Sequence, residues 1–244
     1  MHKAVSESVE LSVIMPAFNE EACIEGTVRE VHEVLLGTGR PFEIIVVDDG
    51  STDATPARLQ ALAAELPGLR VIRLTPNSGQ SAAMKAGFRA ARGGLLVTMD
   101  ADGQNDPAEI PRLLERLERC DVCCGYREKR QDTLAKRVGS RWANAIRNRA
   151  LKEQVRDTGC TLKAFKAEWA RDLPLEWRGM HRFLPALMAM RGARIEELPV
   201  HHRARAGGRS KYTNWGRLKE TIWDLWAVRW MQKRHRRFTA EEQA

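Results

Sequence analysis

The sequence alternates short apolar segments with amphipathic ones between residues 11 and 99, and this alternation constrains the fold more than any other feature. Runs of β-favouring residues predict strands, and the segments between them have the apolar spacing of helices. The predicted strands are Leu11–Pro16, Phe42–Val47, Arg70–Leu74 and Leu95–Met99, and the predicted helices are Glu20–Leu36, Ala54–Leu66 and Ser78–Ala91. This rhythm is typical of an α/β domain with a mostly parallel central sheet and helices on both faces.

Each predicted strand runs into a polar loop. Ligands of such sheets bind beyond the carboxyl ends of the strands, where loop side chains need not pack into the core. We therefore expect the polar loops to converge on one binding edge. The loops are Asn19-Glu20-Glu21, Asp48-Asp49-Gly50-Ser51-Thr52-Asp53, Asn77-Ser78-Gly79 and Asp100-Ala101-Asp102.

Asp100 and Asp102 stand one residue apart at the end of a predicted strand. Alternate side chains of an extended segment point the same way, so the two carboxylates can share one divalent cation. Mg²⁺ or Mn²⁺ held by so few carboxylates keeps positions open for phosphate oxygens. An EF-hand is excluded, because Asn105 and Pro111 stand where its loop requires Gly and Glu. Gln104 disfavours a phosphatase with an aspartyl nucleophile, and a solvated turn remains the alternative.

The other polar loops are open to two interpretations. A carboxylate of Asp48 or Asp49 can accept a hydrogen bond from a base N–H or a ribose hydroxyl. The same loop can simply cap a helix through Ser51 or Asp53, and both roles can hold at once. Glu20 likewise suits the first turn of a helix because of the helix dipole.

The second half of the chain is more basic. The whole chain has 40 Lys and Arg residues against 32 Asp and Glu residues, a formal charge of +8 that favours phosphate-bearing partners. Beyond about Tyr126 the strand signal weakens, and helices are predicted around Thr133–Leu151 and His181–Met190. The segment Asn214–Arg237 mixes Trp and Leu with Lys and Arg, which predicts an amphipathic helix that ends in a basic cluster.

Cysteine usage and hydropathy indicate the cellular compartment. The five cysteines form no paired framework, and Cys120-x-x-Cys123-Cys124 has no second Cys or His pair that would complete a zinc site, so we expect structural thiols. No apolar stretch approaches the roughly 20 residues that span a bilayer. The N-terminus lacks the basic-then-apolar order of a secretory signal. We expect residence on the cytosolic side.

Four motifs in order resemble the family 2 glycosyltransferases of GT-A fold. They are Pro16-Ala-Phe-Asn-Glu20, Asp48-Asp-Gly-Ser-Thr-Asp53, Asn77-Ser-Gly79 and Asp100-Ala-Asp-Gly-Gln104. Within the family the chain looks most like the branch of dolichol-phosphate mannose synthase and the bacterial polyprenyl-phosphate glycosyltransferases. Later segments of that branch resemble Asp157–Lys163, Val200–Arg205 and Gly208–Tyr212. The Gln-x-x-Arg-Trp signature of processive synthases is missing at Arg141-Trp142, which favours a single transfer.

The resemblance implies inverting transfer of one sugar from a nucleotide-sugar donor, GDP-mannose or a UDP-sugar, to a polyprenyl phosphate. It implies that Asp100, Asp102 and Gln104 hold Mg²⁺ or Mn²⁺, and that Asp100, Asp102 and Asp157 are catalytic. It assigns the donor to Pro16, Phe18, Glu20, Asp48, Asp49, Asn77, Asp100, Ala101, Asp102, Arg205 and Lys211. It assigns the acceptor phosphate to Arg127, Lys136, Arg137, Arg203 and Ser210, and the late basic segment that includes Arg203 and Ser210 would also close over the donor diphosphate.

The acceptor decides what Asp157 does. A sugar hydroxyl would need a carboxylate base to remove its proton, which is the role of Asp157 in an alternative transferase of cell-envelope glycans. A lipid phosphate with a second pKa of about 6 is already largely dianionic at neutral pH and needs no base, so Asp157 would then orient the acceptor or a basic residue.

His181 and His202 are expected to be structural. A non-catalytic basic protein that binds nucleic acid or membrane is the third hypothesis.

The expected organisation is one catalytic domain over residues 1–213 and a tail over 214–244. Residues 11–125 would bind the nucleotide sugar and 126–213 the acceptor. Trp and Leu of Trp215–Arg237 can enter a membrane interface while Lys and Arg meet anionic headgroups, which would place the protein peripherally on the cytoplasmic face. Packing of the same apolar stripe on the catalytic domain is the equal alternative.

Overall fold

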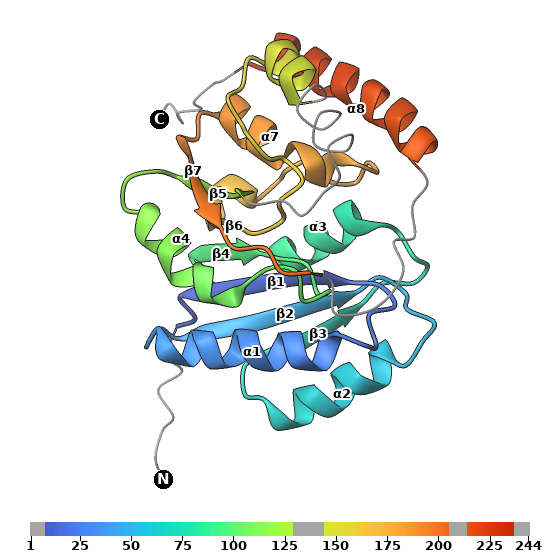
Figure 1. Ribbon diagram of the computed structural model, residues 1–244, viewed down its shortest axis with the longest axis vertical. Helices are drawn as coiled ribbons and strands as arrows, with labels where there is room; N and C mark the ends of the chain where they lie inside the picture. The colour runs from blue at the N-terminus through green and yellow to red at the C-terminus, as the bar shows by residue number, and fades with distance from the viewer. Residues whose placement is uncertain (1–7, 129–143, 205–213, 237–244) are drawn as a thin grey trace, which may run out of the picture.

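A seven-stranded sheet with the order β3-β2-β1-β4-β6-β5-β7 runs through the molecule (Figure 1). The computed structural model describes residues 8–128, 144–204 and 214–236. The strands are β1 (Leu11–Ala17), β2 (Phe42–Asp48), β3 (Leu69–Arg73), β4 (Leu95–Thr98), β5 (Val122–Arg127), β6 (Lys163–Lys166) and β7 (Ile195–Val200). Of these, β6 alone is antiparallel to its neighbours, β4 and β5. The predicted α/β fold with a mostly parallel sheet is confirmed.

Helices cover both faces of the sheet. The helices are α1 (Ile24–Gly37), α2 (Thr55–Glu65), α3 (Gln80–Ala90), α4 (Ile110–Arg116), α6 (Ala167–Ala170), α7 (Leu184–Arg191) and α8 (Asn214–Arg234), with 3₁₀ turns η1 (Pro107–Glu109) and η2 (Met180–Phe183). Apolar residues of α1, α2 and α4 share one core with the sheet, and those of α3, α6, α7 and α8 pack on the opposite face (Figure 1).

Successive residues of the central strands pack alternately into these two cores. Val13 and Met15 of β1 belong to the core under α1, whereas Ile14 between them packs with α3. Ile44 and Ile45 of β2 divide in the same way. Because both faces are covered, β1 and β2 have continuous apolar runs, Val13–Ala17 and Ile44–Val47, which explains the runs that the sequence shows.

The boundaries of two predicted helices differ from the structure. Helix α1 begins at Ile24 and not at Glu20, because the residues between them form a turn. In that turn the carbonyl of Glu20 accepts from the backbone N–H of Ile24 (2.9 Å), and the N–H of Glu20 donates to Thr55 Oγ1 (2.9 Å), so the turn joins the start of α1 to the start of α2. The helix predicted over His181–Met190 is divided into η2 and α7.

The second half contains more sheet than the sequence indicates. Strands β6 and β7 have no counterpart among the predicted elements. Of the helix predicted over Thr133–Leu151, residues 144–151 are helical, and the rest lies outside the described residues. The predicted C-terminal helix is α8, which ends three residues earlier than expected, at Arg234. Across the three described ranges no helix is long and apolar enough to cross a membrane.

The order of strands determines where a ligand can bind. Strand β1 pairs in parallel with β2 on one side and with β4 on the other. The connections that follow neighbouring strands at this point of the sheet therefore run in opposite directions from the carboxyl ends of the strands. A crevice forms at such a reversal of strand order. The loops after β1, β2 and β4 all begin at this edge, as the sequence predicts.

Candidate active site

A cavity of about 620 Å³ lies beyond the carboxyl ends of β1, β2 and β4. This volume is in the range of pockets that enclose small ligands. Its wall includes most of the residues that the sequence assigns to donor and metal: Pro16, Phe18, Glu20, Asp49, Asn77, Asp100, Ala101, Asp102 and Gln104. Arg127, assigned to the acceptor phosphate, also lines it. The four polar loops therefore meet in one cavity, as expected.

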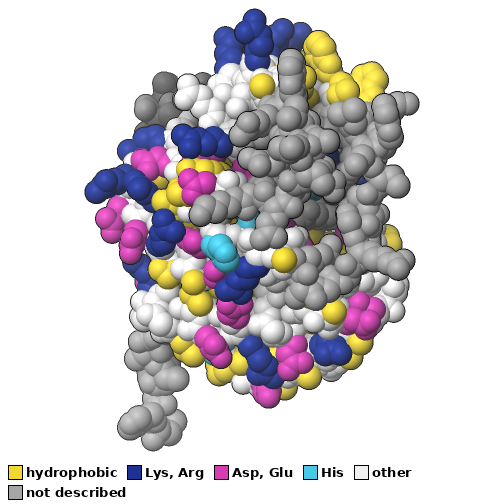
Figure 2. Space-filling model, in the orientation of Figure 1, with side chains coloured by type: hydrophobic (Ala, Val, Ile, Leu, Met, Phe, Trp, Pro, Cys, Tyr) yellow, Lys and Arg dark blue, Asp and Glu magenta, His cyan; other side chains and the backbone are white. Residues whose placement is uncertain are grey.

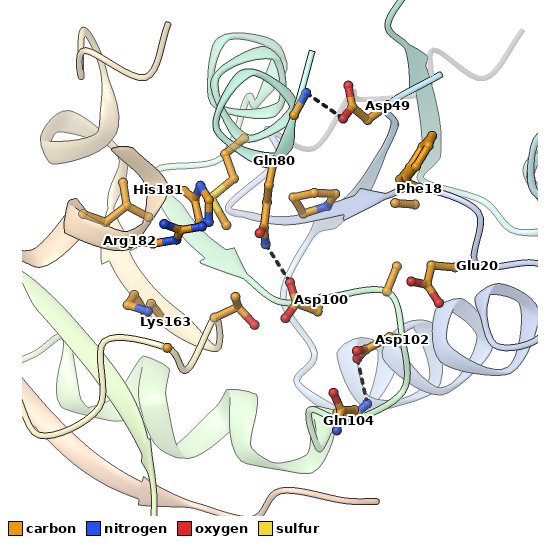
Figure 3. Close-up of a pocket in the computed structure, with 18 of the residues that line it drawn as sticks. Phe18, Glu20, Asp49, Gln80, Asp100, Asp102, Gln104, Lys163, His181 and Arg182 are labelled. Atoms are coloured by element: carbon orange, nitrogen blue, oxygen red, sulfur yellow. Dashed lines mark hydrogen bonds between the residues drawn. The ribbon is translucent and has the colours of Figure 1, made fainter. Parts of the chain in front are cut away.

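Asp100 lies at the centre of this cavity. Its Oδ1 accepts a hydrogen bond from Gln80 Nε2 (2.9 Å), and its backbone N–H donates to Asn105 Oδ1 (3.0 Å) (Figure 3). Burial, and then the neighbouring carboxylate of Asp102, raise the pKa of Asp100 to about 6. A buried carboxylate beside a like charge is stabilised by a cation, which is the environment that a divalent metal requires.

The loop that follows Asp100 is bent and not extended. Strand β4 ends at Thr98, and Gly103 has a φ of 75°. Asp102 Oδ1 accepts from the backbone N–H of Gln104 (3.1 Å), so Asp102 points toward Gln104 while Asp100 points toward Gln80 (Figure 3). The expectation of parallel side chains on an extended segment is wrong, although both carboxylates line the cavity.

Asp49 joins the loop after β2 to the start of α3. Its two carboxylate oxygens accept from the backbone N–H groups of Ser78 (2.7 Å) and Gly79 (2.8 Å) and from Asn77 Nδ2 (3.0 Å). Burial raises the pKa of this carboxyl, and the two backbone N–H groups oppose the rise. The bonds fix Asp49 and Asn77 against each other on the cavity wall.

Asp48 does not line the cavity. Its side chain is buried, its Oδ1 accepts from the backbone N–H of Ser51 (2.9 Å), and its Oδ2 lies 3.4 Å from Arg73 Nε. The last residue of β2 points away from the ligand edge because alternate side chains of a strand point to opposite sides. Of the two adjacent carboxylates, only Asp49 lines the cavity. The capping interpretation also applies, since Asp53 Oδ1 accepts from the N–H of Thr55 (2.9 Å).

Arg127 is tied to Asp157 by a two-pronged ion pair. Arg127 Nε and Nη2 lie 2.7 and 2.9 Å from the two oxygens of Asp157, and the backbone N–H of Arg127 also donates to it (3.2 Å). Gly159 permits this arrangement, because a Cβ there would lie 2.9 Å from Arg127 Nη2. Asp157 itself does not line the cavity. The geometry favours an orienting role for Asp157 over that of a base.

Arg203 does not reach the cavity. Its guanidinium binds both oxygens of Glu30 on α1 (2.8 Å each) and Oδ1 of Asp106 (2.8 Å), and its backbone N–H donates to the carbonyl of Gln104 (2.8 Å). Carboxylates thus occupy the guanidinium of Arg203 in this structure, and its assignment to a phosphate stays a prediction. The predicted residues Lys136, Arg137, Arg205, Ser210 and Lys211 lie outside the described residues.

Several residues of the cavity wall escaped the sequence assignment. Among them are Gln80, Lys163, His181 and Arg182. Gln80 directly follows the Asn77-Ser-Gly79 motif, and Lys163 ends the segment that resembles the acceptor side, so their positions beside motifs were the available signal. His181 was expected to be structural; its Nδ1 lies 2.8 Å from Ser81 Oγ, yet the ring also faces the cavity (Figure 3).

The family model described as Glycosyl transferase family 2 matches residues 12–173, which include β1 to β6 and every loop of the cavity described above except η2. This chain belongs to glycosyl transferase family 2. The resemblance seen in the four motifs is thereby confirmed, and the GT-A fold agrees with it.

Two relatives share much of the chain. A dodecaprenyl-phosphate galacturonate synthase of Rhizobium johnstonii is 40% identical over 228 residues, which cover 91% of this chain and 67% of the relative. An undecaprenyl-phosphate 4-deoxy-4-formamido-L-arabinose transferase of Pseudomonas aeruginosa is 40% identical over 218 residues, 88% of this chain and 63% of the relative. The chain thus spans about two thirds of the length of these family 2 relatives.

Solved structures of more distant proteins have the same fold. Glucosyl-3-phosphoglycerate synthase of Mycobacterium tuberculosis, in complex with Mn²⁺ and UDP-glucose, matches 91% of the chain with a TM-score of 0.66 and 22% identity, over 79% of its own length. A mannosyltransferase of Pyrobaculum calidifontis in complex with GDP-Man and Mn²⁺ matches 84% with a TM-score of 0.62 and 22% identity, over 59% of its length.

Proposed function

We propose that this family 2 glycosyltransferase moves a single sugar from a nucleotide-sugar donor to a polyprenyl phosphate, with inversion at the anomeric carbon. One observation carries the proposal. A single cavity holds acidic residues at its centre, a polar and aromatic wall on one side and basic side chains on the other (Figure 3). Relatives that are 40% identical are named for transfer to polyprenyl phosphates, which supports this acceptor class.

The donor would bind with its nucleoside beside Phe18, Asp49 and Asn77 and its diphosphate near Asp100 and Asp102. The residues at the centre fit Mg²⁺ or Mn²⁺, because burial and carboxylate repulsion leave Asp100 in need of a cation. Among the described residues no three His, Cys, Asp or Glu side chains cluster as a closed metal cage. A metal bound there would keep positions for phosphate oxygens and would stabilise charge on the leaving nucleotide.

The nucleophile would be a charged oxygen of the acceptor phosphate itself. A phosphomonoester is largely dianionic at neutral pH, so its oxygen can attack the anomeric carbon without a base. The protein must then hold two phosphate groups together against their repulsion, which basic side chains accomplish. Asp157 supports this by fixing the guanidinium of Arg127, with which it makes two side-chain hydrogen bonds.

We also propose peripheral binding to the cytoplasmic face of a membrane through α8. Three tryptophans of this helix, Trp223, Trp226 and Trp230, are 76%, 68% and 62% exposed, and the helix also carries the basic Arg229 and Lys233. Figure 2 shows hydrophobic and basic side chains at the upper end of the molecule, where Figure 1 places α8. Val228 is fully buried against the catalytic core, so one side of the helix packs and another carries the tryptophans. The two alternatives for the tail therefore describe different sides of one helix.

Because the sheet takes strands from both halves, we propose one catalytic domain over residues 1–213.

Acceptor dependence tests the proposal. The purified protein is incubated with Mn²⁺, a radiolabelled nucleotide sugar and undecaprenyl phosphate, and the label that enters the organic phase is counted. We expect label there only when the lipid phosphate is present, and a loss of at least about a hundredfold in Asp102→Asn. Label that passes only to water-soluble acceptors would instead support a transferase for sugar hydroxyls. An Asp102→Asn variant with unchanged transfer would contradict the metal site.

A further inference from the structure

Lys163 is a buried cation on the cavity wall. Its side chain is 3% exposed, and its Nζ donates to the backbone carbonyl of Cys160. It makes no ion pair with any residue that the structure describes. A buried ammonium is costly unless it is paired, and the charge of Lys163 is balanced here through the electrostatic interaction with the carboxylate of Asp100. Once a metal neutralises Asp100 and Asp102, the charge of Lys163 is compensated less.

Arg182 is a second cation on the same wall, presented by η2. Its Nη1 donates to Thr221 Oγ1 (3.2 Å) and lies 4.0 Å from Asp224 Oδ2, both on α8. Its Nε and Nη2 have no partner among the described residues. These two nitrogens are the prongs with which arginine binds phosphate or carboxylate oxygens.

The two cations lie at the end of the cavity where the transferred sugar and the acceptor must meet. Figure 3 shows Lys163 and Arg182 on one side of the Gln80–Asp100 hydrogen bond, and Phe18 and Asp49 on the other. Arg127 is less available than the sequence suggests, because two of its nitrogens are committed to Asp157. The anion at this end therefore needs further donors.

We infer that Lys163 and Arg182 form a subsite for an anionic oxygen group of a substrate, either the phosphate of the acceptor or a carboxylate on the transferred sugar. This inference rests on the proposed function; Lys163 ends the segment that resembles the acceptor side but had no role assigned to it, and Arg182 lies outside the motifs of the resemblance. Thr221 of α8 lines the cavity and bonds to Arg182, so α8 positions the arginine. A lipid phosphate that arrives along the tryptophan-bearing helix would meet Arg182 at the cavity mouth.

Binding assays with matched variants test the subsite. Lys163→Met and Arg182→Gln remove the charges, and Lys152→Met and Arg89→Gln remove exposed charges outside the cavity. Farnesyl phosphate with farnesol as its neutral control reports the acceptor phosphate, and UDP-glucuronate against UDP-glucose reports a sugar carboxylate. Retained affinity for UDP with Mn²⁺ shows that each variant is folded. Lys163→Arg and Arg182→Lys keep the charge and are expected to restore part of the binding.

We expect both cavity variants to weaken one anionic probe by about ten- to a hundredfold, with its neutral control and the surface variants unchanged. Loss of farnesyl phosphate assigns the subsite to the acceptor, and loss confined to UDP-glucuronate assigns it to the sugar. Unchanged affinity for both anionic probes overturns the inference, even if the enzyme transfers sugar normally. A wild-type protein that binds a probe through these residues but transfers no sugar would leave the subsite standing and contradict the proposed function.

Discussion

At the scale of single residues, the pairing of Arg127 with Asp157 distinguishes two chemistries. A catalytic base must accept a proton, whereas a carboxylate that receives three hydrogen bonds from one arginine is stabilised in its charged form. The proposed reaction needs no base, because the acceptor phosphate carries its own charge. Asp157 is then a positioning residue, and its removal should disturb the binding of the acceptor more than the chemical step.

Asp157→Asn keeps the size of the side chain and removes its charge. We expect the KM for polyprenyl phosphate to rise about tenfold or more, with kcat reduced far less. The pH dependence of kcat should show no ionisation that the wild type lacks. Steady-state kinetics with the lipid varied at saturating donor measure this. A collapse of kcat by about a thousandfold with an unchanged KM would instead indicate a base.

Gly159→Ala tests the same pair from the other side. The added Cβ would lie 2.9 Å from Arg127 Nη2, so the guanidinium must shift while the backbone of Gly159 keeps an ordinary conformation. We expect a KM effect on the lipid in the same direction as that of Asp157→Asn, with the midpoint of thermal unfolding nearly unchanged. Equal KM values for the variant and the wild type would show that the position of Arg127 does not matter for the acceptor.

The residues that sequence reasoning found and missed differ in what determines their position. Asp49 and Asp100 stand directly after apolar strands, so the local pattern places them at the ligand edge. Lys163 reaches the cavity because β6 inserts between β4 and β5, and no local pattern reveals these pairings, in which Lys163 lies opposite Thr98 and Cys124. The contact of Arg203 with Glu30 was not predicted, because the two residues are 173 positions apart in the sequence.

At the scale of elements, α8 combines two surfaces that a hydrophobic pattern alone does not separate. Leu225, Val228 and Met231 pack toward the catalytic core, while Trp223, Trp226 and Trp230 face outward. The sequence predicts the helix and its amphipathic composition, but burial depends on where α7 lies. The first-half elements were predictable because each has its own local pattern, even where the pairing is not local, as in β4, which pairs with β1 and not with β3.

The triple change Trp223→Ser, Trp226→Ser and Trp230→Ser should reduce binding to vesicles that contain anionic phospholipid by at least about tenfold, because apolar area at the interface is lost. Vesicle sedimentation measures this, and raised salt should weaken the remaining binding through the basic residues. Leu36→Ser is the control, since Leu36 is 61% exposed on α1, on the other face of the sheet. Unchanged binding of the triple variant would exclude α8 as the membrane contact.

At the scale of the whole molecule, Glu43 holds together the edge of the sheet opposite to the cavity. It is 2% exposed and accepts from Ser12 Oγ (2.7 Å), from the backbone N–H of Arg92 (2.7 Å) and from Arg70 Nη1 (2.6 Å). Burial alone would raise the pKa of Glu43, but these three donors hold it below its usual value. The carboxylate therefore links β1, β2, β3 and the segment before β4.

Glu43→Gln should lower the free energy of unfolding by about 1–3 kcal/mol at pH 7. Because the folded-state pKa lies below the unfolded value of about 4.3, the stabilisation by the charged form is present above that pH and is lost as the pH falls through the folded-state pKa. The difference between variant and wild type should thus shrink toward pH 3. Urea titrations across pH measure it, with the exposed Glu33→Gln as control. A difference that stays constant with pH would contradict this account.

The central claim is that one sugar passes to the oxygen of a lipid phosphate, and the mass of the product tests it most directly. The purified protein is supplied with undecaprenyl phosphate, Mn²⁺ and a panel of GDP- and UDP-sugars, and the lipid extract is analysed by mass spectrometry. The account predicts a product with the mass of the lipid, one phosphate and one sugar, formed with a matching nucleoside diphosphate. A lipid diphosphate sugar, a lipid with several sugars, or unmodified lipid across the whole panel would contradict it.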